Sequence, residues 1–337
     1  MTSPTSGDSE LFAGIDGGGS TTRAIVASAD GTIFGVGRAE GCNPSQLGIT
    51  AARENLRSAF TAAWQYAGLT SQTVSAAFCG IAGVRAFAAQ AAVDPLWQEL
   101  FPGLNPGAVA WDHDLRIALA GGLSGKPGIV LIAGTGSACY ARDENGATTQ
   151  VGGWGPLIDD AGSGYSLGLQ LLREAVRAWE ERAPRTAVIG QLEDAENLRD
   201  PAAALQWTRS FAEARPQIAR LAQLVLRAWR EGDPSATRWV EEGTQQLAWM
   251  VATAAERIFA ARSVEAIFVG GLSQNSEYFE KVRAALKKLT NVNLCRPALS
   301  PTAGALLLAL EQRKITPSAD LLKKLRNLSG EPRVERK

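Results

Sequence analysis

The chain has 337 residues, enough for two domains, and 45% of them are hydrophobic, as in a globular protein with a full core. Lys and Arg number 34, as do Asp and Glu, so the zero net charge argues against nucleic acid or a membrane surface as the main partner. No apolar run reaches the roughly 18 residues of a membrane span. Four scattered cysteines without a CxxC pair argue against a zinc or iron–sulfur site and fit a reducing cytoplasm; they are Cys42, Cys79, Cys139 and Cys295.

The first part of the chain predicts strands and helices in alternation after a polar leader at residues 1–10, which carries no signal-peptide pattern and is expected to be disordered. Three strands are expected from Leu11 to Val36, with a glycine turn and a second turn at Asp30-Gly31. The elements expected next are a helix at 49–67, a strand at Val74–Gly80, a helix at Gln90–Leu100, a strand at Ala108–Trp111 that ends at Asp112-His113-Asp114, and a helix at Leu115–Gly121.

The second part opens on the same pattern of strand, glycine turn and strand. The expected elements are a strand at Ile129–Ala133, a turn at Gly134–Ser137, a strand at Ala138–Ala141 and a hairpin turn at Asn145-Gly146. Helix is expected after Gly168 to about Ala261, with a break at Arg227–Pro234. A strand at Ala266–Val269 precedes Gly270-Gly271, a helix runs from Ser300-Pro301 to about Gln312, and the basic tail after Ile315 is expected to be loosely held.

The two glycine-rich turns are the most informative motifs, because each lies between two strands at a corresponding point of a similar segment. The first includes Gly17, Gly18, Gly19, Ser20 and Thr21, and the second includes Gly134, Thr135, Gly136 and Ser137. Glycine lets backbone N–H groups approach an anion closely, and Ser and Thr add hydroxyl donors. The pair of turns therefore predicts a site that holds a polyphosphate from two sides.

Several common catalytic motifs are excluded. The nearest approach to a Walker A loop has Ala120 where the first glycine belongs and Pro127 where a magnesium-binding Ser or Thr is needed. No GxGxxG follows a strand, and no GxSxG elbow occurs. His113 is the only histidine, which excludes an HExxH or multi-histidine metal site; beside Asp114 it is expected to serve local packing.

The acidic residues next to the turns are the candidates for chemistry. Asp16 ends a strand just before the first turn, where it can hold Mg²⁺ near phosphates or cap its own turn; the glycine turn favours the metal role. Asp114 stands at a strand-to-helix junction, either as helix N-cap or as general base toward a hydroxyl, and Asp112 is an equal rival. Asp160 binds hydroxyls or caps the helix after Gly162.

Trp154 stands between glycines, where no helix places it, so its ring suits the apolar face of a sugar or an acyl group. The tryptophans of the helical stretches are expected to be structural instead.

Together these residues resemble the N-acetylglucosamine kinases, which are grouped with the glucosamine kinases and the activating ATPases of benzoyl-CoA reductase. The resemblance covers roughly residues 11–312 and rests on Asp16-Gly17-Gly18-Gly19-Ser20, Asn43, His113-Asp114, Ala133–Ser137, Gly152-Gly153-Trp154-Gly155, Asp160–Ser163 and Gly270-Gly271. It implies an α/β fold of two ribonuclease-H-like domains, as in actin and hexokinase, with ATP and sugar in a cleft between them. The implied divisions are a leader at 1–10, an N-terminal domain at 11–122, a C-terminal domain at 123–299, a returning helix at 300–314 and a tail at 315–337.

The resemblance also assigns roles. It implies that Asp114 is the catalytic base, that Asp16 binds Mg²⁺, and that Gly270 and Gly271 lie near adenosine. ATP-binding positions are Gly17, Gly18, Gly19, Ser20, Thr21, Gly134, Thr135, Gly136, Ser137, Gly270 and Gly271. Sugar-contacting positions are Asn43, Thr135, Gly136, Gly153, Trp154 and Asp160. The implied reaction is transfer of the ATP γ-phosphate to the 6-hydroxyl of an amino sugar, with Mg²⁺, by a cytoplasmic homodimer.

Four other interpretations stay open from the sequence. The substrate is N-acetylglucosamine in the first interpretation, and glucosamine or N-acetylmuramic acid in its rivals. The chain could also be a reductase-activating ATPase, against which the scattered cysteines argue, or a sugar sensor without catalysis, against which Asp114 and both turns argue.

Overall fold

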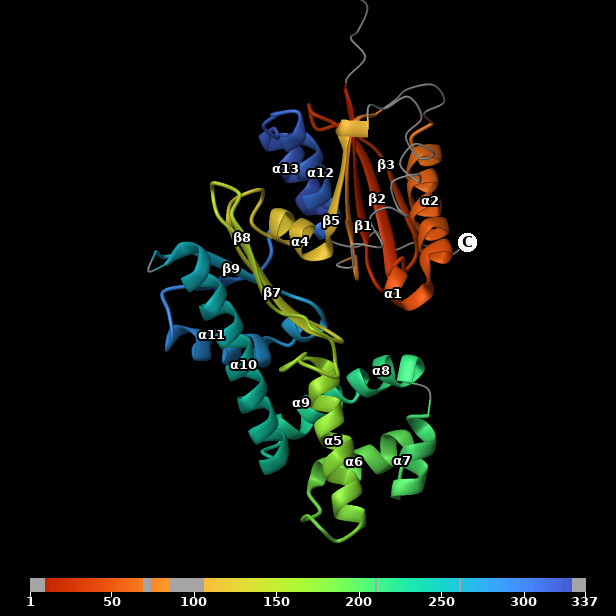
Figure 1. The fold of residues 1–337 in the computed structure, drawn as a ribbon, viewed down its shortest axis with the longest axis vertical. Helices are drawn as coiled ribbons and strands as arrows, with labels where there is room; N and C mark the ends of the chain where they lie inside the picture. The colour runs from red at the N-terminus through yellow and green to blue at the C-terminus, as the bar shows by residue number, and fades with distance from the viewer. Residues whose placement is uncertain (1–9, 69–73, 85–105, 210, 261, 329–337) are drawn as a thin grey trace, which may run out of the picture. The chain divides into compact units, whose positions relative to one another are not determined.

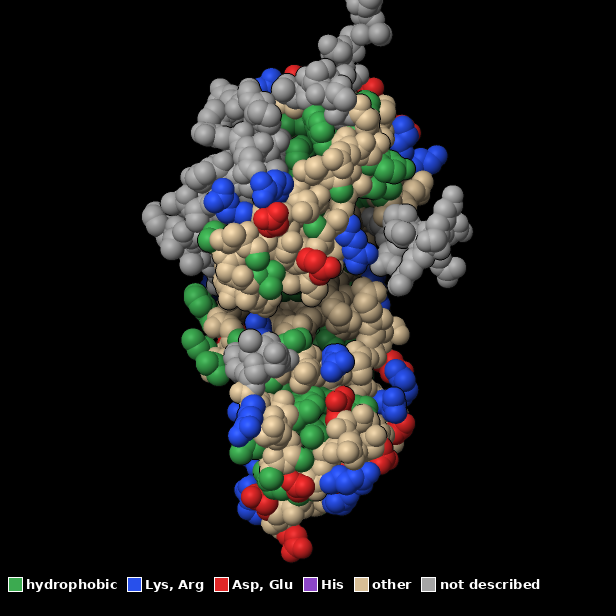
Figure 2. All heavy atoms as spheres, turned by 90° about the vertical axis from the view of Figure 1, so that its right-hand side faces the viewer, with side chains coloured by type: hydrophobic (Ala, Val, Ile, Leu, Met, Phe, Trp, Pro, Cys, Tyr) green, Lys and Arg blue, Asp and Glu red, His purple; other side chains and the backbone are tan. Residues whose placement is uncertain are grey.

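The computed structural model describes residues 10–68, 74–84, 106–209, 211–260 and 262–328. It divides the chain into two compact units, Met1–Pro127 with Pro297–Lys337, and Gly128–Arg296. The helix expected at Gln90–Leu100 and nearly all of the expected leader lie outside the described residues. Figure 2 shows Lys and Arg side chains interspersed with Asp and Glu over the face turned to the viewer, as the balanced composition leads one to expect.

The first unit is built on a five-stranded sheet in the order β3-β2-β1-β4-β5. β1 pairs antiparallel with β2 and parallel with β4, and β4 pairs parallel with β5. The strands are β1 Leu11–Gly17, β2 Thr21–Ser28, β3 Ile33–Glu40, β4 Val74–Ile81 and β5 Val109–His113. The helices are α1 Pro44–Leu47, α2 Ile49–Tyr66, α4 Asp114–Gly122, α12 Pro301–Gln312 and α13 Ala319–Leu328, with a 3₁₀ turn η1 at Pro106–Ala108.

Helices cover both faces of this sheet (Figure 1). α2 packs on β2 and β3 through apolar residues spaced three or four apart, as an amphipathic helix requires. Gly35 and Gly37 of β3 allow a very close approach, because a Cβ at either would stand about 2 Å from a carbonyl oxygen of α2. α12 covers the other face, and a Cβ at Gly14 of β1 would stand 2.4 Å from its backbone.

The second unit repeats this sheet, in the order β10-β9-β6-β7-β8. Here β6 pairs antiparallel with β7 and parallel with β9, as β1 pairs with β2 and β4. The strands are β6 Gly128–Ala133, β7 Ser137–Arg142, β8 Thr148–Gly152, β9 Glu265–Val269 and β10 Asn293–Cys295. The helices are α5 Gly164–Trp179, α6 Ala187–Glu196, α7 Pro201–Trp207, α8 Phe211–Arg220, α9 Ala222–Arg230, α10 Pro234–Phe259 and α11 Ser276–Lys287, with a 3₁₀ turn η2 at Gly271–Gln274.

Most expected elements are present, and several differ. The tail after Ile315 is not loosely held along its whole length, because α13 buries Leu321 and Leu325 completely in the core under α12. Their i, i+4 spacing was the available signal. α5 begins at Gly164 rather than after Gly168, since the Ser163 hydroxyl accepts the N–H of Ser166 as an N-cap. The strands β8 and β10 and the helix α11 were not predicted.

The start of α12 agrees with the sequence: Ser300 accepts the N–H of Ala303 and Pro301 opens the first turn. In the part of the chain that the structure describes, every helix is too short or too polar to span a bilayer.

Candidate active site

In the first unit, the candidate residues collect at the carboxyl edge of the parallel strands. The register aligns Asp16 of β1 with Gly80 of β4, and Gly80 with Asp112 of β5. Asp114 follows two residues later, in the first turn of α4. Ligands of open α/β sheets bind at this edge, so the sheet order places Asp16, Asp112 and Asp114 where a substrate is expected.

The first glycine turn joins β1 to β2 and is held at both ends. The N–H of Gly18 donates to Thr21 O at 3.0 Å, and Gly18 O accepts the N–H of Cys42 at 2.9 Å. Gly17 is required for close packing, because a Cβ there would stand 2.4 Å from Cys42 Sγ. Gly19 and Ser20 are exposed at the tip. The turn is therefore a rigid, accessible stretch of backbone directly after Asp16.

Asp16 has a strongly perturbed pKa. Burial raises its pKa to about 7, against the opposing charge of Arg23, its cross-strand neighbour on β2. The charge of Asp114 raises the pKa further, and the Thr302 hydroxyl of α12 lowers it. Two carboxylates that disfavour each other's ionisation suit a divalent cation, which would relieve the repulsion.

The residues at this edge suit a cation that is bound jointly by the protein and a ligand, rather than a cation enclosed by protein ligands alone. Among the described residues, no group of three or more His, Cys, Asp or Glu side chains could hold a metal. Mg²⁺ usually keeps several waters and binds through one or two carboxylates plus substrate phosphates, so Asp16 beside the first turn meets that requirement.

The structure separates Asp112 from Asp114. Asp112 Oδ1 accepts the backbone N–H of His113 at 2.7 Å and lies 3.6 Å from His113 Nε2. The N-cap of α4 is His113, without a side-chain cap bond, so the N-cap role considered for Asp114 is wrong. Asp114 Oδ1 accepts the N–H of Leu115 at 3.0 Å, and its charge acts on Asp16. Asp114 therefore acts on the candidate metal ligand Asp16, while Asp112 is engaged with His113.

In the second unit, the second glycine turn joins β6 to β7 and is tied to the start of α5. Within it, Gly134 N–H donates to Gly136 O at 2.9 Å. The N–H of Gly164 donates to Gly134 O at 2.8 Å, and that of Tyr165 to Thr135 O at 3.2 Å. The turn is thus held against the start of α5, whose first two N–H groups donate to the carbonyl oxygens of the turn.

Gly270 and Gly271 follow β9 at the same edge of this sheet. β9 runs parallel to β6, and a Cβ at Gly134 would stand 3.7 Å from the Gly271 nitrogen. Gly270 has φ +94° and packs so tightly that a Cβ would stand 2.5 Å from Ala133 O. The structure therefore brings the second turn and the Gly270-Gly271 turn together.

Asp160 has a different environment from the one expected of a hydroxyl ligand. Asp160 is only 3% exposed, and its Oδ1 accepts the N–H of Ser137 at 3.1 Å. Oδ2 lies 3.4 Å from Nη2 of Arg215, on α8. Burial raises the pKa of Asp160, while the Ser137 N–H and the Arg215 charge lower it. Asp160 does not cap α5, whose N-cap is Ser163; it holds the second turn.

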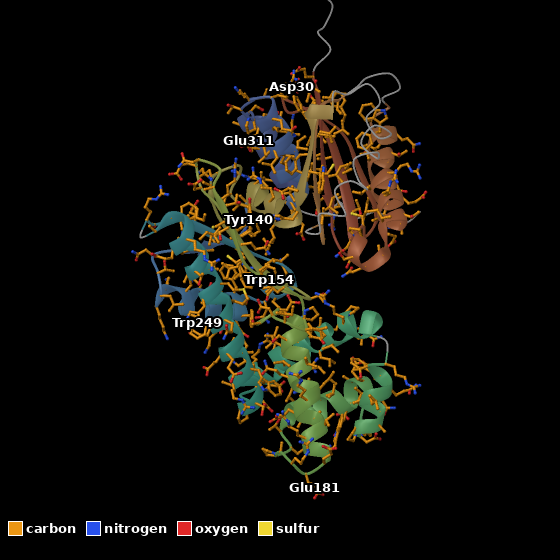
Figure 3. The ribbon with its side chains drawn as sticks, viewed as in Figure 1. Asp30, Tyr140, Trp154, Glu181, Trp249 and Glu311 are labelled. Atoms are coloured by element: carbon orange, nitrogen blue, oxygen red, sulfur yellow. The ribbon has the colours of Figure 1, made fainter. Side chains whose placement is uncertain are left out.

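Trp154 lies just past the end of β8, in a loop of glycines with positive φ (Figure 3). Its residue is 63% exposed, so it does not wedge the core. Gly153, with φ +75°, precedes it and leaves no room for a Cβ against Ala138. In the first unit, Asn43 is the N-cap of α1: Oδ1 accepts the N–H of Ser45 at 3.0 Å.

Sequence reasoning missed Arg23, Thr302 and Arg215. Arg23 had an available signal, because a hairpin at the first turn places it opposite Asp16. Thr302 and Arg215 come from distant helices, and nothing near them in the sequence marked them.

A protein-family model described as the BadF/BadG/BcrA/BcrD ATPase family matches residues 13–309. The chain belongs to this family, and the resemblance noted from the sequence is confirmed.

Its relatives include amino-sugar kinases. An N-acetylmuramic acid/N-acetylglucosamine kinase of Clostridium acetobutylicum is 28% identical over 284 residues, covering 83% of this chain and 90% of the relative. An N-acetyl-D-glucosamine kinase of Dictyostelium discoideum is 23% identical over 319 residues, covering 90% and 99%.

A solved structure of a candidate N-acetylglucosamine kinase from Chromobacterium violaceum has a TM-score of 0.71 at 26% identity, covering 89% of this chain and 99% of that one. The predicted fold class is confirmed.

Proposed function

We propose that the protein is an ATP-dependent kinase that transfers the γ-phosphate to the 6-hydroxyl of an amino sugar, with N-acetylglucosamine as the preferred substrate. The observation that carries this proposal is the pair Asp16 and Asp114 beside the first glycine turn, in a member of an ATPase family with amino-sugar kinase relatives. In this proposal Asp16 binds the cation and Asp114 accepts the proton.

In this proposal Asp114 accepts the proton of the 6-hydroxyl as its oxygen attacks phosphorus. Asp114 is favoured over Asp112 as this base because its charge acts on Asp16, beside the first glycine turn, whereas Asp112 is engaged with His113. Phosphoryl transfer needs little covalent help from the protein, so positioning and charge stabilisation are expected to supply most of the rate.

The proposal assigns nucleotide-binding residues in each unit separately. Asp16 would hold Mg²⁺, which neutralises charge on the phosphoryl oxygens when it is bound. The exposed tip of the first turn and the second turn would donate to phosphate oxygens. Gly270 and Gly271, which lie beside the second turn, would face adenosine.

The sugar side rests on residues with different support. Two of them, Thr135 and Gly136, lie in the second turn. Gly153 and Trp154 follow β8, which pairs with β7, and the exposed Trp154 ring offers an apolar face. Asp160 would act by holding the second turn, because both carboxylate oxygens have partners within the protein. Asn43 keeps its amide nitrogen for a hydroxyl while its oxygen caps α1.

The rivals of this proposal are two other substrates and two other classes of protein, a redox-partner ATPase and a non-catalytic sugar sensor. Glucosamine and N-acetylmuramic acid are the alternative substrates, and the second is supported by the name of the Clostridium relative. A redox-partner ATPase would need cysteine ligands for an iron–sulfur cluster. Burial shields Cys42, Cys79 and Cys139 and raises their thiol pKa values, which disfavours that role. The cytoplasmic location and the homodimer stay predictions.

The decisive experiment measures ADP release with a panel of amino sugars, ATP and Mg²⁺, and locates the phosphate by NMR. Phosphate on O6, dependent on divalent metal, supports the proposal. Activity without sugar acceptors, phosphate on O1, or turnover that survives chelation contradicts it.

A further inference from the structure

Arg215 is the basic residue that α8 brings to the carboxylate of Asp160. Its Nη2 lies 3.4 Å from Asp160 Oδ2, and its side chain is 26% exposed. Its Nε is buried and has no hydrogen-bond acceptor within the described ranges. The guanidinium is therefore paired on one side and keeps donor capacity on another.

The position of this pair follows from the packing of α8 on α5. A Cβ at Gly168 would stand 1.9 Å from Ile218 O, and one at Gly164 would stand 3.0 Å from Ala219 O. Gly164 donates to Gly134 of the second turn, and Asp160 Oδ1 accepts the Ser137 N–H at the end of the same turn. Arg215 thus contacts Asp160, which in turn contacts Ser137 at the end of the second turn.

Under the proposed function the sugar contacts the second turn, which Asp160 holds, so the charge of the pair would act on the substituent at C2 of an amino sugar. Free glucosamine carries an ammonium group, for which a buried carboxylate is the natural partner. In this chain Arg215 already occupies Asp160, so that carboxylate is compensated and a second cation would meet the guanidinium. A neutral acetamido group meets no such repulsion, and its carbonyl oxygen is an acceptor for a guanidinium donor.

We infer that Arg215 is a specificity-determining residue, which makes the site selective for N-acylated amino sugars over free amino sugars. This inference rests on the proposed sugar-kinase function and adds to it the choice of substrate. Asp159 also acts on Asp160 electrostatically and opposes its ionisation, whereas Arg215 favours it. Removal of the Arg215 charge would leave the Asp160 carboxylate without its cation and favour an ammonium ligand in its place.

The test compares kcat/KM for glucosamine and N-acetylglucosamine in the unmodified enzyme and in Arg215→Gln. Gln can still donate to Asp160 but carries no charge. The unmodified enzyme should prefer N-acetylglucosamine, and R215Q should show an absolute rise in glucosamine kcat/KM of about tenfold. Damage to the fold cannot produce such a gain. Arg215→Lys keeps the charge and should keep the rejection of glucosamine.

The matched control is Arg220→Gln, an exposed arginine in the last turn of the same helix, which should change neither substrate. A second measurement needs no variant: the glucosamine to N-acetylglucosamine ratio of the unmodified enzyme should rise as pH passes the pKa of the sugar amine. A native preference for glucosamine, or a ratio that stays constant in R215Q and with pH, overturns the inference while leaving the kinase function standing. Absence of turnover with every sugar overturns the proposed function instead.

Discussion

The charge of Asp114 raises the pKa of Asp16, although the two acids are 98 positions apart in the sequence, with strands β2, β3, β4 and β5 between them. Their approach follows from the order β1-β4-β5, which sets the ends of three parallel strands side by side. Because one acid begins a helix and the other precedes a glycine turn, the two carboxylates have different surroundings and can take different roles.

Asp114→Asn should lower phosphoryl transfer by at least about a hundredfold and leave sugar binding within about tenfold. The amide keeps the size and hydrogen-bonding capacity of the side chain but cannot accept the proton. Single-turnover rates and sugar titration by calorimetry measure the two effects. Asp112→Asn is the matched control two residues away, and it should retain turnover. The reverse pattern would transfer the role of base to Asp112.

The raised pKa of Asp16 predicts that the stability of the folded protein depends on pH. Its pKa rises from 3.8 in the unfolded chain to about 7 in the folded protein, so the folded state binds the proton more tightly. The metal-free protein should therefore lose stability as pH rises from about 4 to about 7, with no further loss from this group above that window. Asp16→Asn removes this dependence.

Melting temperatures across that range check the prediction, because the difference between D16N and the unmodified protein should grow with pH by a few degrees. Mg²⁺ with ADP should raise the melting temperature of the unmodified protein more than that of D16N. A pH-independent difference would show that Asp16 is not the titrating group.

The second turn predicts a steric effect at Gly136. A Cβ there would stand 2.9 Å from both carboxylate oxygens of Asp160, which are themselves held by Ser137 and Arg215. Gly136→Ala should therefore cost on the order of 1–3 kcal/mol of stability and raise the KM for ATP. Gly190→Ala is the control, since a Cβ there meets nothing within 4 Å in helix α6. Equal stability of the two variants would mean that Asp160 moves away without cost.

Local chemistry explains which parts of the site could be predicted from the sequence. The glycine turns and the Ser300-Pro301 helix start have signals within a few residues, and the structure contains them. The preference for Asp114 came from a resemblance, because the spacing alone left Asp112 equal. The structure separates the two acids physically: Asp112 is engaged with His113, and the charge of Asp114 acts on Asp16.

The parts that were missed depend on contacts between distant segments. Arg215 lies 55 residues from Asp160 in the sequence, and its pairing requires the packing of α8 against α5. The helix α13 was taken as a basic tail because its charges dominate its composition, whereas two leucines one turn apart decide its packing. A polar surface composition is common to loops and to exposed helix faces, so it does not distinguish them.

Trp154 gives the last prediction, which concerns the sugar side of the site. Trp154 is 63% exposed between two glycines with positive φ, so it presents a large solvent-exposed surface and contributes little to the core. Trp154→Ala should remove an apolar face worth on the order of 1–2 kcal/mol and raise the KM for the amino sugar roughly five- to thirtyfold. The KM for ATP and the melting temperature should change little.

The control is Trp249→Ala, at another half-exposed tryptophan, on α10, which should leave both KM values unchanged. Measured KM values for both substrates, together with thermal unfolding, decide the question: a large loss of stability with an unchanged sugar KM would assign Trp154 a structural role.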